Sequence, residues 1–202
     1  ICDKICKLLP TMSDVPEDLQ ALEEALSDTY FCNFSLFQSI PDSWAIKQLF
    51  PIMPIHRLHE RPTQHAVLGD ITCDSDGKID QFIDRRDVKK TLPLHAFNGD
   101  PYLLGVFLVG AYQEILGDLH NLFGDTHVVH IRLDDAHGWW IEEIIKGDTA
   151  RAVLGYMQYD PGELYPRFAR DCERAMRDGS LSVAEGQALK RFYESELAGY
   201  TY

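Results

Sequence analysis

The order of secondary-structure patterns along the chain is the strongest constraint on its fold. Short segments rich in β-branched and aromatic residues recur between positions 30 and 146, whereas residues 147–202 carry three helical patterns. Each of these helical patterns has its own start signal: Asp148-Thr149, then Asp160-Pro161 with Glu163, then a capping box of Ser182 with Glu185. Strands followed by helices predict an α+β fold.

Local patterns predict individual elements within this order. Residues 13–28 form an amphipathic helical pattern with Ser13 or Asp14 as its cap. Further along, we predict a strand and turn over 30–42, a short helix over 43–50, a strand buried on both faces over 102–110, a helix over 111–123, and a hairpin whose strands flank Asp135–Gly138. The expected fold is a mainly antiparallel β-barrel or sandwich, preceded by a helix and followed by about three helices.

Composition narrows the classes of partner. The net charge is −13, from 19 basic and 32 acidic residues, which argues against a nucleic-acid or anionic-membrane surface and suits a cationic small molecule. Because we find neither an export signal nor an apolar run near the ~20 residues of a membrane span, and because the five cysteines are irregularly spaced, we expect reduced thiols in the cytoplasm. The chain begins with Ile, so we expect a piece of a longer protein.

One polar stretch, D-I-T-C-D-S-D-G-K-I-D at residues 70–80, concentrates candidate chemistry at the expected end of a strand. A solitary cysteine is most often a small buried apolar residue. Here the carboxylates of Asp74 and Asp76 surround Cys73 with negative charge, which disfavours the thiolate and makes the protonated thiol a proton donor. Asp74 is suited to accept a guanidinium in a bidentate pair.

Metal sites fit the sequence poorly. An EF-hand register that places Gly77 at position six leaves Thr72 and Ile83 where the first and last ligands belong. Cys2 and Cys6 lack a second pair of zinc ligands, and His127 and His130 point to opposite faces of a strand. We therefore predict that the chain's own residues form no metal site.

At this stretch and elsewhere, the sequence resembles the C-terminal part of the biosynthetic arginine decarboxylases. These are pyridoxal-phosphate enzymes of the alanine racemase-like fold type. The resemblance covers nearly the whole chain. It rests on N-F-S-L-F-Q-S-I-P-D (33–42), L-F-P-I-M-P-I-H-R-L (49–58), the stretch at 70–80, L-L-G-V-F-L-V-G-A-Y-Q-E-I-L-G-D-L-H-N-L-F-G-D (103–125) and the final G-Y-T-Y. It implies three parts: the end of a helical insertion (1–29), the C-terminal β-domain (30–146) and a closing helical segment (147–202).

The resemblance also implies roles for single residues. Cys73 matches the cysteine that protonates the substrate carbon after CO2 leaves, and Asp74 matches the acid that meets the distal cationic end of the substrate. Tyr112 matches a tyrosine that touches the cofactor phosphate and ring region. His120 occupies a position whose side chain often lines the substrate pocket in relatives. The resemblance also suggests that Asp76 contacts the substrate.

As a whole, the resemblance implies an enzyme that converts L-arginine to agmatine and CO2 in polyamine biosynthesis. Its pyridoxal phosphate would be held mainly by a barrel domain whose lysine motif is absent here, so this piece alone would be inactive. It also implies a homodimer or larger homo-oligomer with the active site at the interface, and Mg²⁺ as a further cofactor. Two alternatives stay open: a non-catalytic dimerisation or regulatory module, and a related ornithine or diaminopimelate decarboxylase.

Overall fold

The computed structural model describes residues 26–85 and 87–202, together with residues 4, 5, 8, 11, 12, 19 and 22. The predicted helix 13–28 falls almost entirely outside these residues. Contacts divide the chain into two units, residues 1–117 and residues 118–202, and each is described by itself. The domain borders implied by the resemblance stay a prediction.

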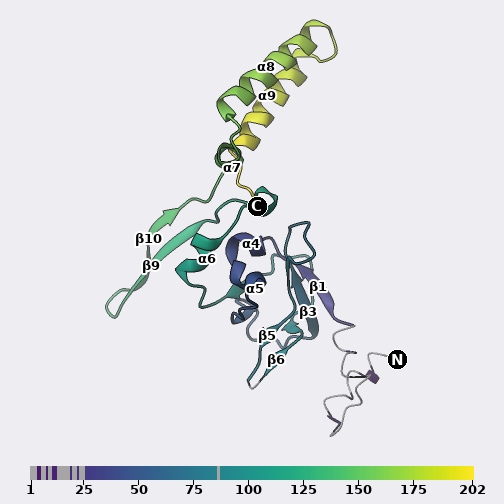
Figure 1. Cartoon of the computed structure of the whole chain (residues 1–202), viewed down its shortest axis with the longest axis vertical. Helices are drawn as coiled ribbons and strands as arrows, with labels where there is room; N and C mark the ends of the chain where they lie inside the picture. Colours follow the sequence, from purple (N-terminus) through teal and green to yellow (C-terminus); the bar gives the residue numbers. More distant parts are fainter. Residues whose placement is uncertain are drawn as a thin grey trace. The chain divides into compact units, whose positions relative to one another are not determined.

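Strand β3 (Gln64–Gly69) is the centre of the first unit (Figure 1). On one side it pairs in parallel with β1 (Asp28–Phe31), and on the other it pairs antiparallel with β7 (Leu92–Leu94) and then with β4 (Lys78–Ile79). Ala66 and Leu68 alternate inward along β3 into the hydrophobic core. That core consists of Leu36, Ile40, Phe50, Ala66, Leu68, Ile79, Phe82, Leu92 and Leu94.

Two further antiparallel pairs complete the strands of this unit. They are β2 (Ile52–Pro54) with β8 (Leu104–Val106), and β5 (Phe82–Ile83) with β6 (Val88–Lys89). The predicted α+β class with mainly antiparallel pairing is confirmed. Among the described residues these strands form small separate sheets, and no closed barrel is found there.

The predicted strand over 30–40 is wrong beyond Phe31, because helix α4 (Leu36–Ser39) begins soon after it. Ser35 caps this helix by accepting a hydrogen bond from the Gln38 amide at 3.3 Å. Helix α5 (Pro41–Ala45) follows at once, with proline at its first position, so the predicted helix 43–50 starts earlier and ends earlier than expected.

The apolar run 102–110 is also different from its prediction. Only Leu104–Val106 is a strand, and it pairs with β2 alone, whereas Leu103 and Leu108 are 55% and 85% exposed. The run therefore is not a strand buried on both faces. The predicted helix 111–123 is reduced to α6 (Ala111–Leu116), which ends where the backbone becomes extended at Gly117 (φ −56°, ψ 145°). A side chain at Gly117 would overlap the Gln38 carbonyl.

The second unit contains the predicted hairpin and helices. Strands β9 (Val128–Asp134) and β10 (Gly138–Ile145) pair antiparallel, and Gly138 adopts a φ of 75° in the turn. Helices α7 (Ala150–Tyr156), α8 (Pro161–Arg177) and α9 (Val183–Leu197) follow. Their predicted start signals are confirmed, because Thr149, Asp160 and Ser182 each accept a backbone hydrogen bond at the helix start.

The C-terminal residues fasten the end of α9 to the segment that precedes the hairpin. Tyr200 stacks on the His127 ring at 4.1 Å, and Tyr202 stacks on Phe123 at 5.2 Å. Between them, the Thr201 hydroxyl accepts a hydrogen bond from the Gly124 amide at 3.0 Å. The final G-Y-T-Y motif therefore has a structural role. No described helix is long and apolar enough to cross a membrane.

In the first unit, β3 leads directly into the polar stretch through Asp70, whose carboxylate is buried. One oxygen accepts from the Leu36 amide at 2.9 Å, while the other accepts from the Thr72 amide at 2.9 Å and the Thr72 hydroxyl at 2.7 Å. The Asp70 amide donates to the Gly77 carbonyl at 2.8 Å, closing the loop at its base. Asp70 thus joins β3, helix α4 and both ends of the loop.

The base of this loop leaves no room for a side chain at position 77. A Cβ on Gly77 would overlap the Asp70 carboxylate and lie 2.6 Å from the Thr72 hydroxyl. We predict that Gly77→Ala lowers the free energy of unfolding by about 1–3 kcal/mol. Denaturant unfolding would show this as an earlier transition. Gly110→Ala, whose added methyl group meets open space, should cost much less, and equal losses in both variants would contradict the account.

The capping box of α9 generates a pH prediction. Hydrogen bonds from the Ser182 hydroxyl and amide lower the pKa of the Glu185 carboxyl, so its capping contribution exists above the ordinary glutamate pKa and is lost as the pH falls through the lowered one. In Ser182→Ala the hydroxyl bond is gone, and the Glu185 pKa should rise. An NMR titration of the Glu185 side-chain carboxyl measures this directly, and an unchanged midpoint would contradict it.

Candidate functional site

The loop between Asp70 and Gly77 presents its polar side chains outward from an ordered backbone. The Asp74 carboxylate accepts from the Asp76 amide at 2.9 Å, and the Asp74 carbonyl accepts from the Gly77 amide at 3.0 Å. Two tight turns therefore shape the tip. Cys73, Asp74 and Asp76 are all exposed, so the predicted thiol and carboxylates lie together on one short loop.

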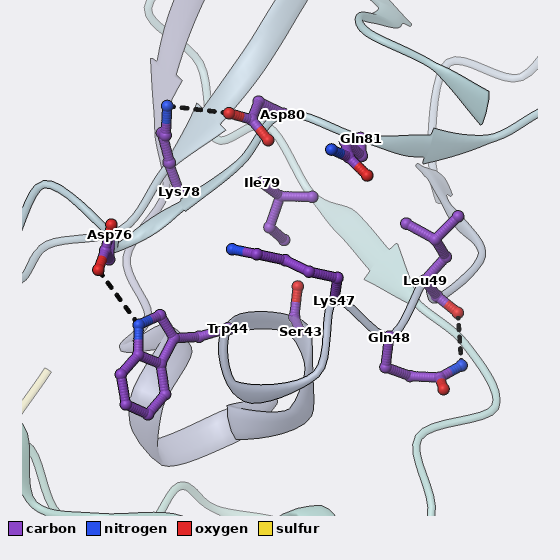
Figure 2. Close-up of a pocket in the computed structure, with 10 residues that line it drawn as sticks. All are labelled: Ser43, Trp44, Lys47, Gln48, Leu49, Asp76, Lys78, Ile79, Asp80 and Gln81. Atoms are coloured by element: carbon purple, nitrogen blue, oxygen red, sulfur yellow. Dashed lines mark hydrogen bonds and ion pairs between the residues drawn. The ribbon is translucent and has the colours of Figure 1, made fainter.

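Beside this loop lies a small cavity of about 50 Å³, shown in Figure 2. Trp44 of helix α5 points its indole toward the loop and donates to the Asp76 carboxylate at 3.3 Å. On the strand side, Lys78 forms an ion pair with Asp80 at 2.9 Å. The cavity is much smaller than the roughly 300–1,000 Å³ of ordinary ligand pockets, so it cannot enclose an amino-acid substrate by itself.

The three cysteines in the described residues have different surroundings. Cys172 is buried within α8. Burial also raises the pKa of the half-buried Cys32 thiol to about 11, which suppresses its thiolate near neutral pH. Cys73 is exposed on the loop and is the most exposed of these three thiols.

Tyr112 lies in the first turn of α6 and is 78% exposed. Its neighbour Gln113 is buried and makes a two-way contact with α5: its side-chain amide donates to the Asp42 carboxylate at 2.6 Å, and its oxygen accepts from the Asp42 amide at 3.1 Å. Helix α6 is therefore fixed to α5, the helix that carries Trp44. Tyr112 and the loop share a scaffold of short helices.

His120 belongs to the second unit and is half-buried in a short 3-10 turn (His120–Leu122), where its amide donates to the Asp118 carboxylate at 2.8 Å. The structure places Cys73, Asp74 and Asp76 on one loop and Tyr112 in the same unit. His120 lies in the other unit, and its role at this site stays a prediction.

Sequence reasoning missed the residues that hold the loop and α6 in place. Trp44 and Gln113 are far from positions 70–77 in sequence, and no local motif marks either of them. Asp70 was part of the polar stretch, but only its burial and its three accepted hydrogen bonds distinguish it from the exposed acids beside it. A buried, satisfied carboxylate of this kind is a structural residue.

Metal ligands do not cluster in the part of the chain that the structure describes. Within residues 26–85 and 87–202 and the few described positions before them, no group of three or more His, Cys, Asp or Glu side chains could hold a metal ion. These residues therefore do not fit a Mg²⁺ site.

Known proteins resemble this chain in both sequence and structure. Residues 150–202 match the family described as the arginine decarboxylase C-terminal helical extension. The whole chain is 55% identical to biosynthetic arginine decarboxylase 1 of Synechocystis sp. and 54% identical to the biosynthetic arginine decarboxylase of Thermosynechococcus vestitus. It spans only 30% and 32% of the length of these two relatives.

A solved structure agrees with these matches. The crystal structure of the biosynthetic arginine decarboxylase from Campylobacter jejuni superposes with a TM-score of 0.77 at 31% identity, over all of this chain and 35% of that one. The helical-extension match fixes which end of the relatives is represented. By sequence and by fold, the chain is similar over its whole length to the C-terminal portion of biosynthetic arginine decarboxylases.

Proposed function

We propose that this chain is the C-terminal portion of an arginine decarboxylase, which converts L-arginine to agmatine and CO2 and so supplies polyamine biosynthesis. The observation that carries the proposal is the ordered loop that presents Cys73 and Asp74 together on the surface, in a chain related over its full length to enzymes of that name. The loop offers a proton donor and an anion at one place, and the reaction needs both.

Cys73 and Asp74 each have one role in the proposed reaction. When the bond between the α-carbon and the carboxylate breaks, CO2 leaves and the α-carbon takes one proton, which the Cys73 thiol donates and solvent later restores. Asp74 receives the guanidinium at the other end of the substrate through charge-assisted hydrogen bonds. Its carboxylate is already oriented by the Asp76 amide, which lowers the entropic cost of binding.

The residues proposed for this site could hold pyridoxal phosphate only in part. The exposed Tyr112 hydroxyl can donate to a phosphate group, while the small cavity beside the loop has no room for the cofactor. When bound, pyridoxal phosphate supplies the electron sink that makes decarboxylation possible. We propose that a barrel domain elsewhere in the full-length protein holds most of the cofactor.

An exposed donor loop also suggests the form of assembly. Because Cys73 and Asp74 face outward and the adjacent cavity cannot enclose arginine, the site is completed by another surface. We propose that this surface belongs to the barrel of a second subunit, as in a homodimer whose active sites lie at the interface. Asp76 and His120 as substrate contacts stay predictions from the family resemblance.

The proton-donor role can be tested with Cys73→Ala in the full-length enzyme. We predict that turnover to agmatine falls by roughly 10²-fold or more, because one positioned general acid is removed. The ratio of agmatine formed to CO2 released should also fall below one, since the carbon is no longer protonated reliably. Ser75→Ala, on the same loop, is the control and should keep both values. Agmatine formation by Cys73→Ala at the normal rate and ratio would refute the role.

Asp74→Asn tests the substrate contact. The amide oxygen can still accept from the Asp76 amide, but the negative charge that attracts the guanidinium is lost. We predict a KM for arginine that is roughly 10–100-fold higher, the size expected for hydrogen bonds to a charged partner. Initial rates with arginine give this KM. Initial rates with ornithine and diaminopimelate, compared with those for arginine, give the substrate class. An unchanged KM, or faster turnover of ornithine or diaminopimelate than of arginine by the unmodified enzyme, would contradict the proposal.

A further inference from the structure

Trp44 and Asp76 are 32 positions apart in the sequence, yet the Trp44 side chain contacts Asp76 at the tip of the loop between Asp70 and Gly77. The indole N–H donates to the Asp76 carboxylate at 3.3 Å, and Figure 2 shows the ring directed from α5 toward that oxygen. Tryptophan has only one hydrogen-bond donor, and here that donor is directed at the site loop.

The indole also packs against an aromatic side chain of α4. Trp44 meets Phe37 edge-to-face at a centroid distance of 5.4 Å, and Phe37 is only 5% exposed on helix α4. The first amide of α4, at Leu36, donates to Asp70 at the base of the same loop. The pair of helices α4 and α5 therefore contacts the loop twice, at its base through Asp70 and at its tip through Asp76.

Asp76 connects this tip contact to the reacting side of the loop. Its carboxylate accepts from Trp44, while its own amide donates to the Asp74 carboxylate at 2.9 Å. A shift of Asp76 would therefore move the carboxylate that we assign to the guanidinium. Because Asp76 is engaged by Trp44, its geometry suits a link in this chain of contacts better than a direct contact with substrate.

We propose that Trp44 is a positioning residue for the Cys73–Asp74 loop and acts through Asp76. This inference rests on the proposed function, because it assigns Trp44 to the same arginine site. Trp44 does not touch the substrate. It holds the tip of the loop against α5, so that Asp74 is already in place when arginine arrives and little ordering entropy is lost on binding.

The test uses four variants of the full-length enzyme: Trp44→Phe, Asp76→Ala, Asp76→Asn and the double variant Trp44→Phe/Asp76→Ala. Phenylalanine keeps the contact with Phe37 but lacks the N–H, and asparagine keeps an oxygen that accepts from the indole. Gln48→Ala is the matched control, because Gln48 lines the same cavity, whereas its side chain, among the described residues, bonds only the neighbouring Leu49 carbonyl.

We expect Trp44→Phe and Asp76→Ala each to lower kcat/KM by about tenfold, mainly by raising KM. A change of this size corresponds to the loss of one hydrogen bond to a charged group. Asp76→Asn should restore most of this loss, and the double variant should be no worse than either single one. Gln48→Ala should match the unmodified enzyme. A general loss of stability would instead reduce the amount of active enzyme, and so the apparent kcat, and would leave KM unchanged.

Three results would overturn the inference while the proposed function stands. The first is a normal KM in Trp44→Phe, and the second is a loss of kcat/KM in Asp76→Asn as large as that in Asp76→Ala. The third is a double variant in which the two single effects multiply. In each case Asp74→Asn would still have a raised KM. If Asp74→Asn itself had a normal KM, the proposed function would fail and the inference would fail with it.

Discussion

The buried carboxylate of Asp70 is the interaction on which the rest of the site depends. Removing a charged group from water is costly unless hydrogen bonds replace its hydration, and here three donors from Leu36 and Thr72 do so. These donors belong to helix α4 and to the loop after β3, so satisfying one charge fixes the strand, the helix and the loop together. Gly77 completes the arrangement because a side chain there would occupy the space of the carboxylate.

On this foundation, we propose, the chain provides one side of an active site. The loop is ordered by its own turns and by Trp44, yet Cys73 and Asp74 remain exposed and the adjacent cavity is too small for a substrate. Helix α6 presents Tyr112 from the same short-helix scaffold through the Gln113–Asp42 pair. Rigid backbone with exposed functional groups is the arrangement expected of a surface that completes a site on another domain.

Sequence reasoning succeeded where local signals decide the structure. The caps at Thr149, Asp160 and Ser182 and the turn at Gly138 depend on neighbouring residues, so the helices and the hairpin of the second unit were predictable.

Sequence reasoning failed where distant contacts decide the structure. The aromatic pattern after Phe31 indicated a strand, but a hydrogen bond from Leu36 to Asp70, 34 residues away, helps to start a helix there. Residues 102–110 were predicted as a buried strand from composition, although only three of them pair.

The same distinction applies to the site. Cys73 and Asp74 could be proposed from the sequence because they are adjacent in one polar stretch. Asp70, Trp44 and Gln113 act through tertiary contacts that the sequence does not display. The most direct test of the central claim is amide hydrogen exchange, measured by NMR on the chain itself, at Leu36 and Thr72. The account predicts that both amides exchange as slowly as those of strand β3, and that both lose this protection in Asp70→Ala. Exchange of the Leu36 and Thr72 amides at the rate of an unprotected peptide in the unmodified chain would contradict it.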